Sequence, residues 1–460
     1  MTEDRETERL IFNAHKKGKA LLQQYPNVIK ARSFRQWLDI VGVAGLFIFS
    51  FGMLFKKSLA HAGIFMMALS FGFTLKDCWR EAVRDRLFAL SVAFFLFLVL
   101  RTFFAAMEFS SYVPQLIEGA LKLFGTGFFL VYLVSFWLNR ARGKWDLVLI
   151  ALMAGFLVQI VRNIDWGNLA AMIDIFQTGS QRATFGFATN RLGLFSALLL
   201  LACLLLYRPM WGSLESGRAW YLARIAFWAL MSCLTAGCLI YSQSRSASLA
   251  AMIVTPAALA FKAFVLHGSK VRRLRPILLV AVLIGVALYM SNATKNLEQR
   301  LAPGNYASGM SARLSLYEIA WENWKKHPFV GRGPGASQLM IQQAGEEYTN
   351  VKDFDHLHNV LFDMAAQVGI IGISFIGLSA LLILQQAFRS RGAEPADRDY
   401  LIFALSALVI MLITGIVNQP FHSPHGVYLA GFLGGICYSS KFTEIASHPL
   451  PIPCRHAAST

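Results

Sequence analysis

Two histidines and an asparagine stand together just before a long apolar run: His356, His358 and Asn359. A histidine with an unperturbed pKa of about 6.5 can accept a proton at neutral pH, so His358 is a candidate general base. Residues two apart do not share a helix face, which makes the two imidazoles poor joint ligands for a metal ion on a helix. A loop could bring them together, or they could simply cap the helix that follows.

Three arginines also stand at the expected ends of apolar segments: Arg191, Arg245 and Arg313. A charge at such a depth is costly unless it is paired, and few acidic residues are near these three in the sequence. A guanidinium binds phosphate through two hydrogen bonds, so the three arginines favour an anionic ligand. The alternative is that each arginine reaches the phosphates of membrane lipids.

Other polar residues are candidates for a supporting role, namely His356, Asn359 and Gln419. Asp353 and Asp355 come nearest to an acidic pair that could hold a cation, but no metal site is expected. The run from Gly331 to Gly335 (Gly-Arg-Gly-Pro-Gly) lacks the Lys-Ser/Thr of a phosphate loop, so a tight turn is expected there.

The composition decides which elements position these residues. Of 460 residues, 56% are hydrophobic and only 15% are charged, against roughly 25% in soluble domains. Long apolar runs, rather than alternating ones, predict an all-α polytopic membrane protein and exclude a β-barrel. The six cysteines show no metal-ligand spacing and support neither a disulfide framework nor a zinc site.

We predict about twelve transmembrane helices, because a span needs about 20 mostly apolar residues. They cover residues 37–54, 59–75, 87–104, 117–138, 146–161, 192–207, 220–241, 246–266, 276–290, 364–388, 400–416 and 426–440. This divides the chain into a tail (1–36), spans one to nine (37–290), a long loop (291–363), spans ten to twelve (364–440) and a second tail (441–460).

The basic residues predict the orientation. The two tails and the loops on their side carry 27 Lys and Arg, whereas the short loops on the other side carry 6. This asymmetry places both termini in the cytoplasm and the long loop on the opposite side. It also accounts for the net charge of +17 without nucleic-acid binding.

The long loop is expected to be partly helical. Ser311 can cap a helix over 312–326, which Pro328 would stop. Within it, Leu314, Tyr317, Trp321 and Trp324 are spaced as an apolar face. In span ten, Gly369 and Gly372 are expected to allow close helix packing.

From His358-Asn359 the sequence continues with nine residues, Gly369, two residues and Gly372. This pattern resembles the signature of the bacterial O-antigen ligase family, which belongs with the O-antigen polymerases. Arg313, Trp321, Pro328, the run from Gly331 to Gly335 and the turn Ser244-Arg245-Ser246 are similar too, so the resemblance spans about residues 185–375.

The resemblance implies a metal-independent membrane glycosyltransferase of the GT-C type, without a cofactor, in the bacterial inner membrane. Its donor would be a polysaccharide on undecaprenyl diphosphate and its acceptor lipid A–core oligosaccharide. His358 would be the general base in the periplasmic loop, Arg245 and Arg313 would hold the donor diphosphate with help from Arg191, and the anomeric carbon would be inverted.

Two alternatives stay open at this point. A polymerase of the same superfamily would join two lipid-linked glycans instead. A protein of another class, a transporter for an anionic lipid or sugar, would line a path with its arginines, although repeated halves or broken helices, which are typical of transporters, are not evident in the sequence.

Overall fold

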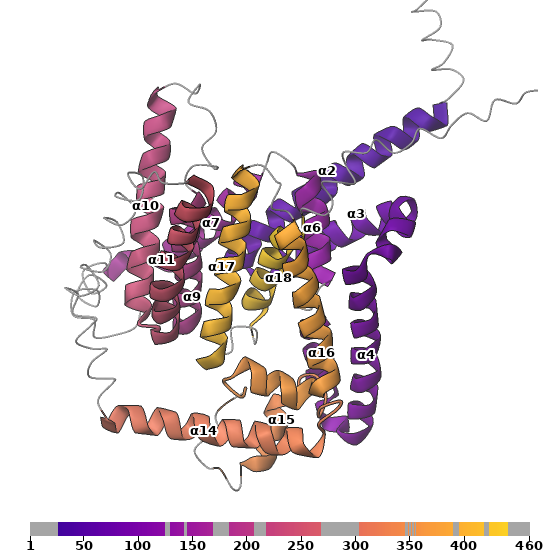
Figure 1. The fold of residues 1–460 in the computed structure, drawn as a ribbon, viewed down its shortest axis with the longest axis vertical. Helices are drawn as coiled ribbons and strands as arrows, with labels where there is room; N and C mark the ends of the chain where they lie inside the picture. The colour runs from indigo at the N-terminus through magenta and orange to yellow at the C-terminus, as the bar shows by residue number, and fades with distance from the viewer. Residues whose placement is uncertain are drawn as a thin grey trace, which may run out of the picture.

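The fold was analysed in a computed structural model, which describes residues 26–124, 129–141, 145–168, 184–206, 218–267, 303–345, 348, 351, 354, 356–389, 395–417 and 423–439. Over these residues the chain forms helices and no strand, which confirms the predicted all-α class (Figure 1). The proposed tails 1–25 and 440–460, the predicted span 276–290, Gln419, Asp353 and Asp355 lie outside the described residues.

The helices follow the chain in this order: α2 (Pro26–Phe55), α3 (Lys57–Arg84), α4 (Arg86–Glu108), η1 (Ser110–Tyr112), α5 (Val113–Phe124), α6 (Leu130–Arg140), α7 (Trp145–Arg162), η3 (Trp166–Asn168), α9 (Thr189–Leu206), α10 (Arg218–Ser242), α11 (Arg245–His267), α14 (Pro303–Lys326), α15 (Ser337–Ala344), α16 (Val360–Arg389), α17 (Pro395–Val417) and α18 (Pro424–Ser439).

Eight of the described helices are long and apolar enough to cross a membrane, so the protein is a multi-pass membrane protein. They lie in α2, α3, α4, α7, α9, α10, α16 and α17. Helices α11 and α18 also occupy positions where spans are predicted. The total of twelve, and the boundaries between tails, spans and loop, stay predictions.

One predicted span differs from the structure. Instead of one helix over 117–138, the chain forms α5 and α6, which are separated by more than one turn. Helix α5 is amphipathic and carries an exposed ion pair between Glu118 and Lys122 at 3.0 Å, whereas residues 130–138 of α6 are all buried. The polar face of α5 is what an apolar average over 117–138 conceals.

Small residues let the first helices pack closely. A Cβ atom at Gly52 would meet the backbone of Leu59 and Ala60, so α2 and α3 approach each other there almost backbone to backbone. Gly42 leaves room for the ring of Trp137, whose indole N–H donates to the carbonyl of Met67 at 3.0 Å. These contacts join α2, α3 and α6 around one buried aromatic side chain.

Helix α14 lies across one end of the bundle, where it contacts α15 and α16 (Figure 1). We call this end of the molecule the α14 end. The helix ends at Lys326, as predicted, but it begins at Pro303, so Ser311 is inside the helix and is not its cap.

The predicted apolar face of α14 is wrong. The buried side chains are instead Ala312, Leu316, Ile319, Ala320 and Asn323, while Leu314 and Trp321 are 58% and 46% exposed. The aromatic residues drew attention because of their size, but the smaller residues at the same helical spacing are the ones that pack.

Polar pairs fasten the helices at the opposite end of the bundle. Lys262 of α11 lies 2.8 Å from Asp399 of α17, and the neighbouring Tyr400 donates to Asp146 of α7. Similarly, Tyr438 of α18 donates to Asp85 at 2.8 Å, and the Asp85 side chain accepts from the first amides of α4. Each pair satisfies a charge or hydroxyl that would be costly to bury alone.

Candidate active site

The two candidate histidines lie in one short loop at the start of α16. Their ring centroids are 4.1 Å apart with an interplanar angle of 34°, and the ring of Phe354 meets His358 edge-on at 5.0 Å. Leu357 between them is fully buried and anchors the loop. His358 has a left-handed backbone with φ 55°, which is uncommon for a residue other than glycine and is typical of a tightly constrained position.

Asn359 explains why this loop ends where it does. Its side-chain oxygen accepts from the amides of Leu361 at 2.9 Å and Phe362 at 3.2 Å, so Asn359 is the N-cap of α16. Its amide nitrogen donates to the carbonyl of Ile416 at 3.0 Å, near the end of α17. The predicted supporting residue therefore fixes the histidine loop to two helices at once.

Helix α16 is broken at Gly369, where φ is 63° and ψ is −168°. The break frees backbone groups that a loop between α14 and α15 then satisfies. The amides of Ile370 and Ile371 donate to the carbonyls of Pro328 and Phe329 at 2.9 and 3.0 Å. In return, the amides of residues 332 and 333 donate to the carbonyls of residues 366 and 367 at 2.8 and 2.9 Å. Gly369 thus permits docking of a loop, rather than only the close helix packing predicted for it.

The glycine-rich run from Gly331 to Gly335 is the docked loop. Its three glycines all have positive φ, as expected of a tight turn, and a Cβ at Gly331 would meet the backbone of Gln367. Arg101 of α4 donates from Nε and Nη2 to the carbonyl of Gly331 at 3.1 and 2.8 Å. The loop is therefore held from α16 on one side and from α4 on the other.

A buried polar network continues this docking toward the histidines. Asp363, which is 1% exposed, accepts a hydrogen bond from the hydroxyl of Ser337 at the start of α15. Gln367 donates to the same hydroxyl oxygen at 2.8 Å and accepts from the amide of Gly335 at 2.6 Å. In addition, Asp363 interacts electrostatically with His356. Sequence reasoning missed these residues, although two polar side chains four apart, at 363 and 367, signal a functional helix face.

Arg313 lies on α14, close to the same part of α16. It is half-buried and stands one turn before Tyr317, whose ring packs against Phe362 with centroids 5.4 Å apart. Residues four apart share a helix face, so Arg313 and Tyr317 are presented on the same side of α14. The structure thus places Arg313 at the helix that carries the histidine loop.

Arg191 and Arg245 form a second group. Arg191 is near the start of α9 and Arg245 is the first residue of α11, and both are half-buried. A Cβ at Gly193 would meet the side chains of Ser242 and Ser244, so the start of α9 touches the turn that carries Arg245. Helix α17 packs on both α9 and α11, and its end is tied to Asn359. All three arginines and both histidines therefore lie at the α14 end.

A further cation at this end has a structural role. Arg332 donates from Nη1 to the side-chain oxygen of Asn323 at 2.9 Å, and its guanidinium lies 4.8 Å from the ring of Phe109. It joins the end of α14 to the end of α4. Partial burial, together with the positive charge of Arg332, lowers the pKa of the neighbouring His327 below its usual value.

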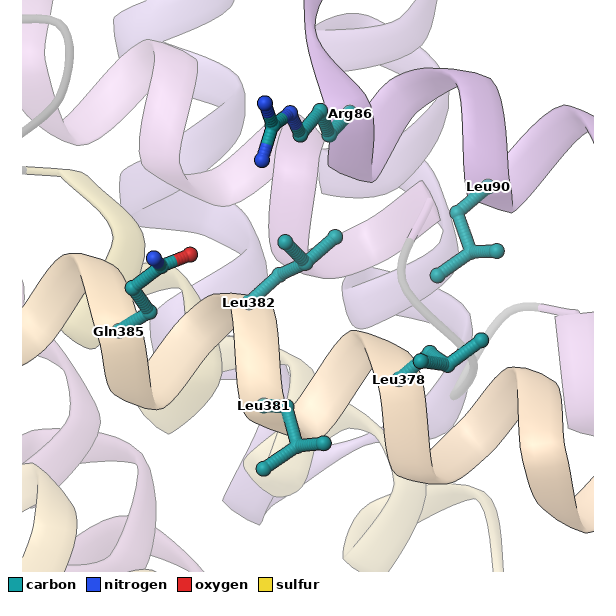
Figure 2. A pocket seen from close by; sticks show the side chains of 6 residues that line it. All are labelled: Arg86, Leu90, Leu378, Leu381, Leu382 and Gln385. Atoms are coloured by element: carbon teal, nitrogen blue, oxygen red, sulfur yellow. The ribbon is translucent and has the colours of Figure 1, made fainter.

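The groove of Figure 2 belongs to a different part of the molecule. It lies between α4 and α16 near the opposite end, has a volume of about 520 Å³, and is lined by Arg86, Leu90, Leu378, Leu381, Leu382 and Gln385. It contains none of the candidate residues. Among the described residues no group of three His, Cys, Asp or Glu side chains could hold a metal ion.

Comparison with known proteins bears on the same part of the chain. The model of the O-antigen ligase family matches residues 229–377, from α10 to the middle of α16. No curated protein matches the chain. The matched residues include Arg245, Arg313 and His358 as well as the break at Gly369, whereas Arg191 precedes them. Through this segment the chain belongs to the O-antigen ligase family.

Proposed function

We propose that this membrane glycosyltransferase is an O-antigen ligase, which transfers polysaccharide from undecaprenyl diphosphate to lipid A–core oligosaccharide. The observation that carries the proposal is the fixed loop of His358, packed at the start of α16 with Arg313 presented from α14. A base beside a cationic helix fits a reaction between a sugar hydroxyl and a lipid diphosphate. The α14 end then faces the periplasm of the inner membrane, and both termini are cytoplasmic.

In the proposed reaction the acceptor hydroxyl attacks the anomeric carbon of the donor sugar and His358 takes its proton. The new glycosidic bond forms as the bond to the diphosphate breaks, so the anomeric carbon is inverted. Negative charge grows on the departing diphosphate, and guanidinium groups aimed at that charge lower the barrier. We assign this role to Arg245 and Arg313, assisted by Arg191, with no metal ion or cofactor involved.

The acceptor distinguishes the ligase from its nearest rival. Purified protein supplied with lipid-linked glycan and lipid A–core is expected to give a covalent glycan–lipid A–core product, detected by mass analysis. With the lipid-linked glycan alone, no longer glycan is expected. Chain elongation without lipid A–core would select the polymerase, and glycan movement across vesicles without any covalent product would select a transporter.

The arginines can be tested by matched substitutions. Arg245→Ala and Arg313→Ala are each expected to lower kcat/KM for the donor by about 10²-fold, the usual effect of removing one group that stabilises transition-state charge. Arg86→Ala is the control, because Arg86 is an exposed arginine in the groove at the opposite end and should leave donor use unchanged. Equal losses in all three variants would contradict diphosphate recognition at the α14 end.

A further inference from the structure

The buried carboxylate of Asp363 is close to the histidine pair but outside the machinery proposed so far. Its backbone N–H donates to the carbonyl of Asn359 at 2.9 Å, so Asp363 stands one turn after the helix cap. Its side chain accepts from the Ser337 hydroxyl, and that hydroxyl oxygen accepts in turn from Gln367. Because Ser337 spends its only O–H on Asp363, the network presents the carboxyl group with a donor, as an ionised carboxylate requires.

The other side of this carboxylate faces the histidines. Asp363 interacts electrostatically with His356, and the ring of His356 lies against the ring of His358 with centroids 4.1 Å apart. The ring of Phe354 covers the His358 imidazole from another direction. An acid, an intermediate imidazole and the candidate base are therefore arranged in sequence within one loop and one helix turn.

Few other charged groups face this arrangement from the described elements. Helix α14 brings Arg313 and Tyr317, and α4 brings Arg101 through the docked loop. Helix α15 and residues 414–417 of α17 contain no titratable residue. Nearby in the sequence, but outside the described residues, are Glu346, Glu347, Lys352, Asp353 and Asp355.

We propose that Asp363 is a positioning residue that acts through His356, holding the histidine pair and stabilising the proton that His358 takes from the acceptor. This inference rests on the proposed function of His358 as the base. When the acceptor O–H bond breaks, the proton and its positive charge arrive on the pair. The fixed negative charge of Asp363 favours that charged state across His356, as a buried carboxylate does for an adjacent imidazole.

The test is the pH dependence of transfer by Asp363→Asn. Asparagine has the same shape and keeps an oxygen for Ser337, but it removes the negative charge. We expect kcat to fall by about 10- to 100-fold, KM for the donor to stay within about twofold, and the acidic limb of the pH–rate profile to move to lower pH. The limb moves down because the pair loses its proton more readily without the carboxylate.

Gln367→Met is the structural control, because it breaks the same network without changing its charge. It is expected to lower thermal stability and leave the acidic limb in place. His356→Phe is a second route to the same answer if Asp363→Asn does not fold: it should shift the limb in the same direction, and adding Asp363→Asn to it should cause no further loss.

An acidic limb that stays in place in Asp363→Asn, or in His356→Phe where Asp363→Asn does not fold, would overturn the inference. The failure of the proposed function is a separate result. If transfer persists in a His358 variant, His358 is not the base. If His358 variants are inactive while both neighbours leave the pH profile unchanged, only the role of Asp363 is refuted.

Discussion

Replacing His358 with asparagine or alanine is expected to abolish transfer of the glycan while the protein remains folded. A general base typically contributes 10²–10⁴-fold to the rate, and neither replacement can accept the proton. Asparagine is the better replacement, because it tolerates the left-handed backbone that His358 adopts at φ 55°. The measurement is product formation from lipid-linked glycan and lipid A–core, with thermal unfolding in detergent as the test of folding.

His327→Ala is the matched control for this experiment. His327 lies at the same end of the molecule, but its imidazole is at the end of α14 rather than in the histidine pair, and its contact with the docked loop is made by its backbone carbonyl. The control is expected to retain activity within about twofold of the unmodified protein. Full activity in both His358 variants would show that another group accepts the proton.

Gly369→Ala is expected to produce the largest loss of stability of any single glycine substitution in α16. Alanine at φ 63° is strained, and its Cβ would meet the carbonyl of Phe329 in the docked loop. Together these effects should destabilise the protein by about 3 kcal/mol and loosen the loop. Thermal unfolding in detergent and limited proteolysis between residues 328 and 335 provide the two measurements.

The same helix supplies the control. Gly377→Ala adds a methyl group in a regular part of α16, where nothing lies within 4 Å of the new atom. It is expected to leave stability unchanged or to raise it by up to about 1 kcal/mol, because alanine favours a helix over glycine. If Gly369→Ala were as well tolerated as Gly377→Ala, the break in α16 would not be what holds the loop.

The transmembrane helices could be predicted from the sequence because an apolar run of sufficient length signals a span without knowledge of its neighbours. The interfacial helices could not. The buried face of α14 is set by α15 and α16, and a window of average hydrophobicity cannot see that α5 and α6 are separate helices. Both depend on contacts between segments far apart in the chain.

The candidate site divides in the same way. His358-Asn359 could be recognised locally, and Asn359 before an apolar run already has the form of a helix cap. The roles of Arg101 and Asp363 could not, since their partners are 230 and 26 residues away in the sequence. Gly369 was visible as a small residue, but only the loop that fills the break reveals its use.

The polar pairs at the opposite end of the bundle have a consequence for how the protein is made. Asp85 meets Tyr438, which is translated 353 residues later, and Asp146 meets Tyr400, 254 residues later. A ribosome must therefore deliver nearly the whole polypeptide before the earliest carboxylates find these hydroxyls. The last two helices act as the closing step of assembly, and a chain cut short before them would expose the same acidic groups to membrane quality control.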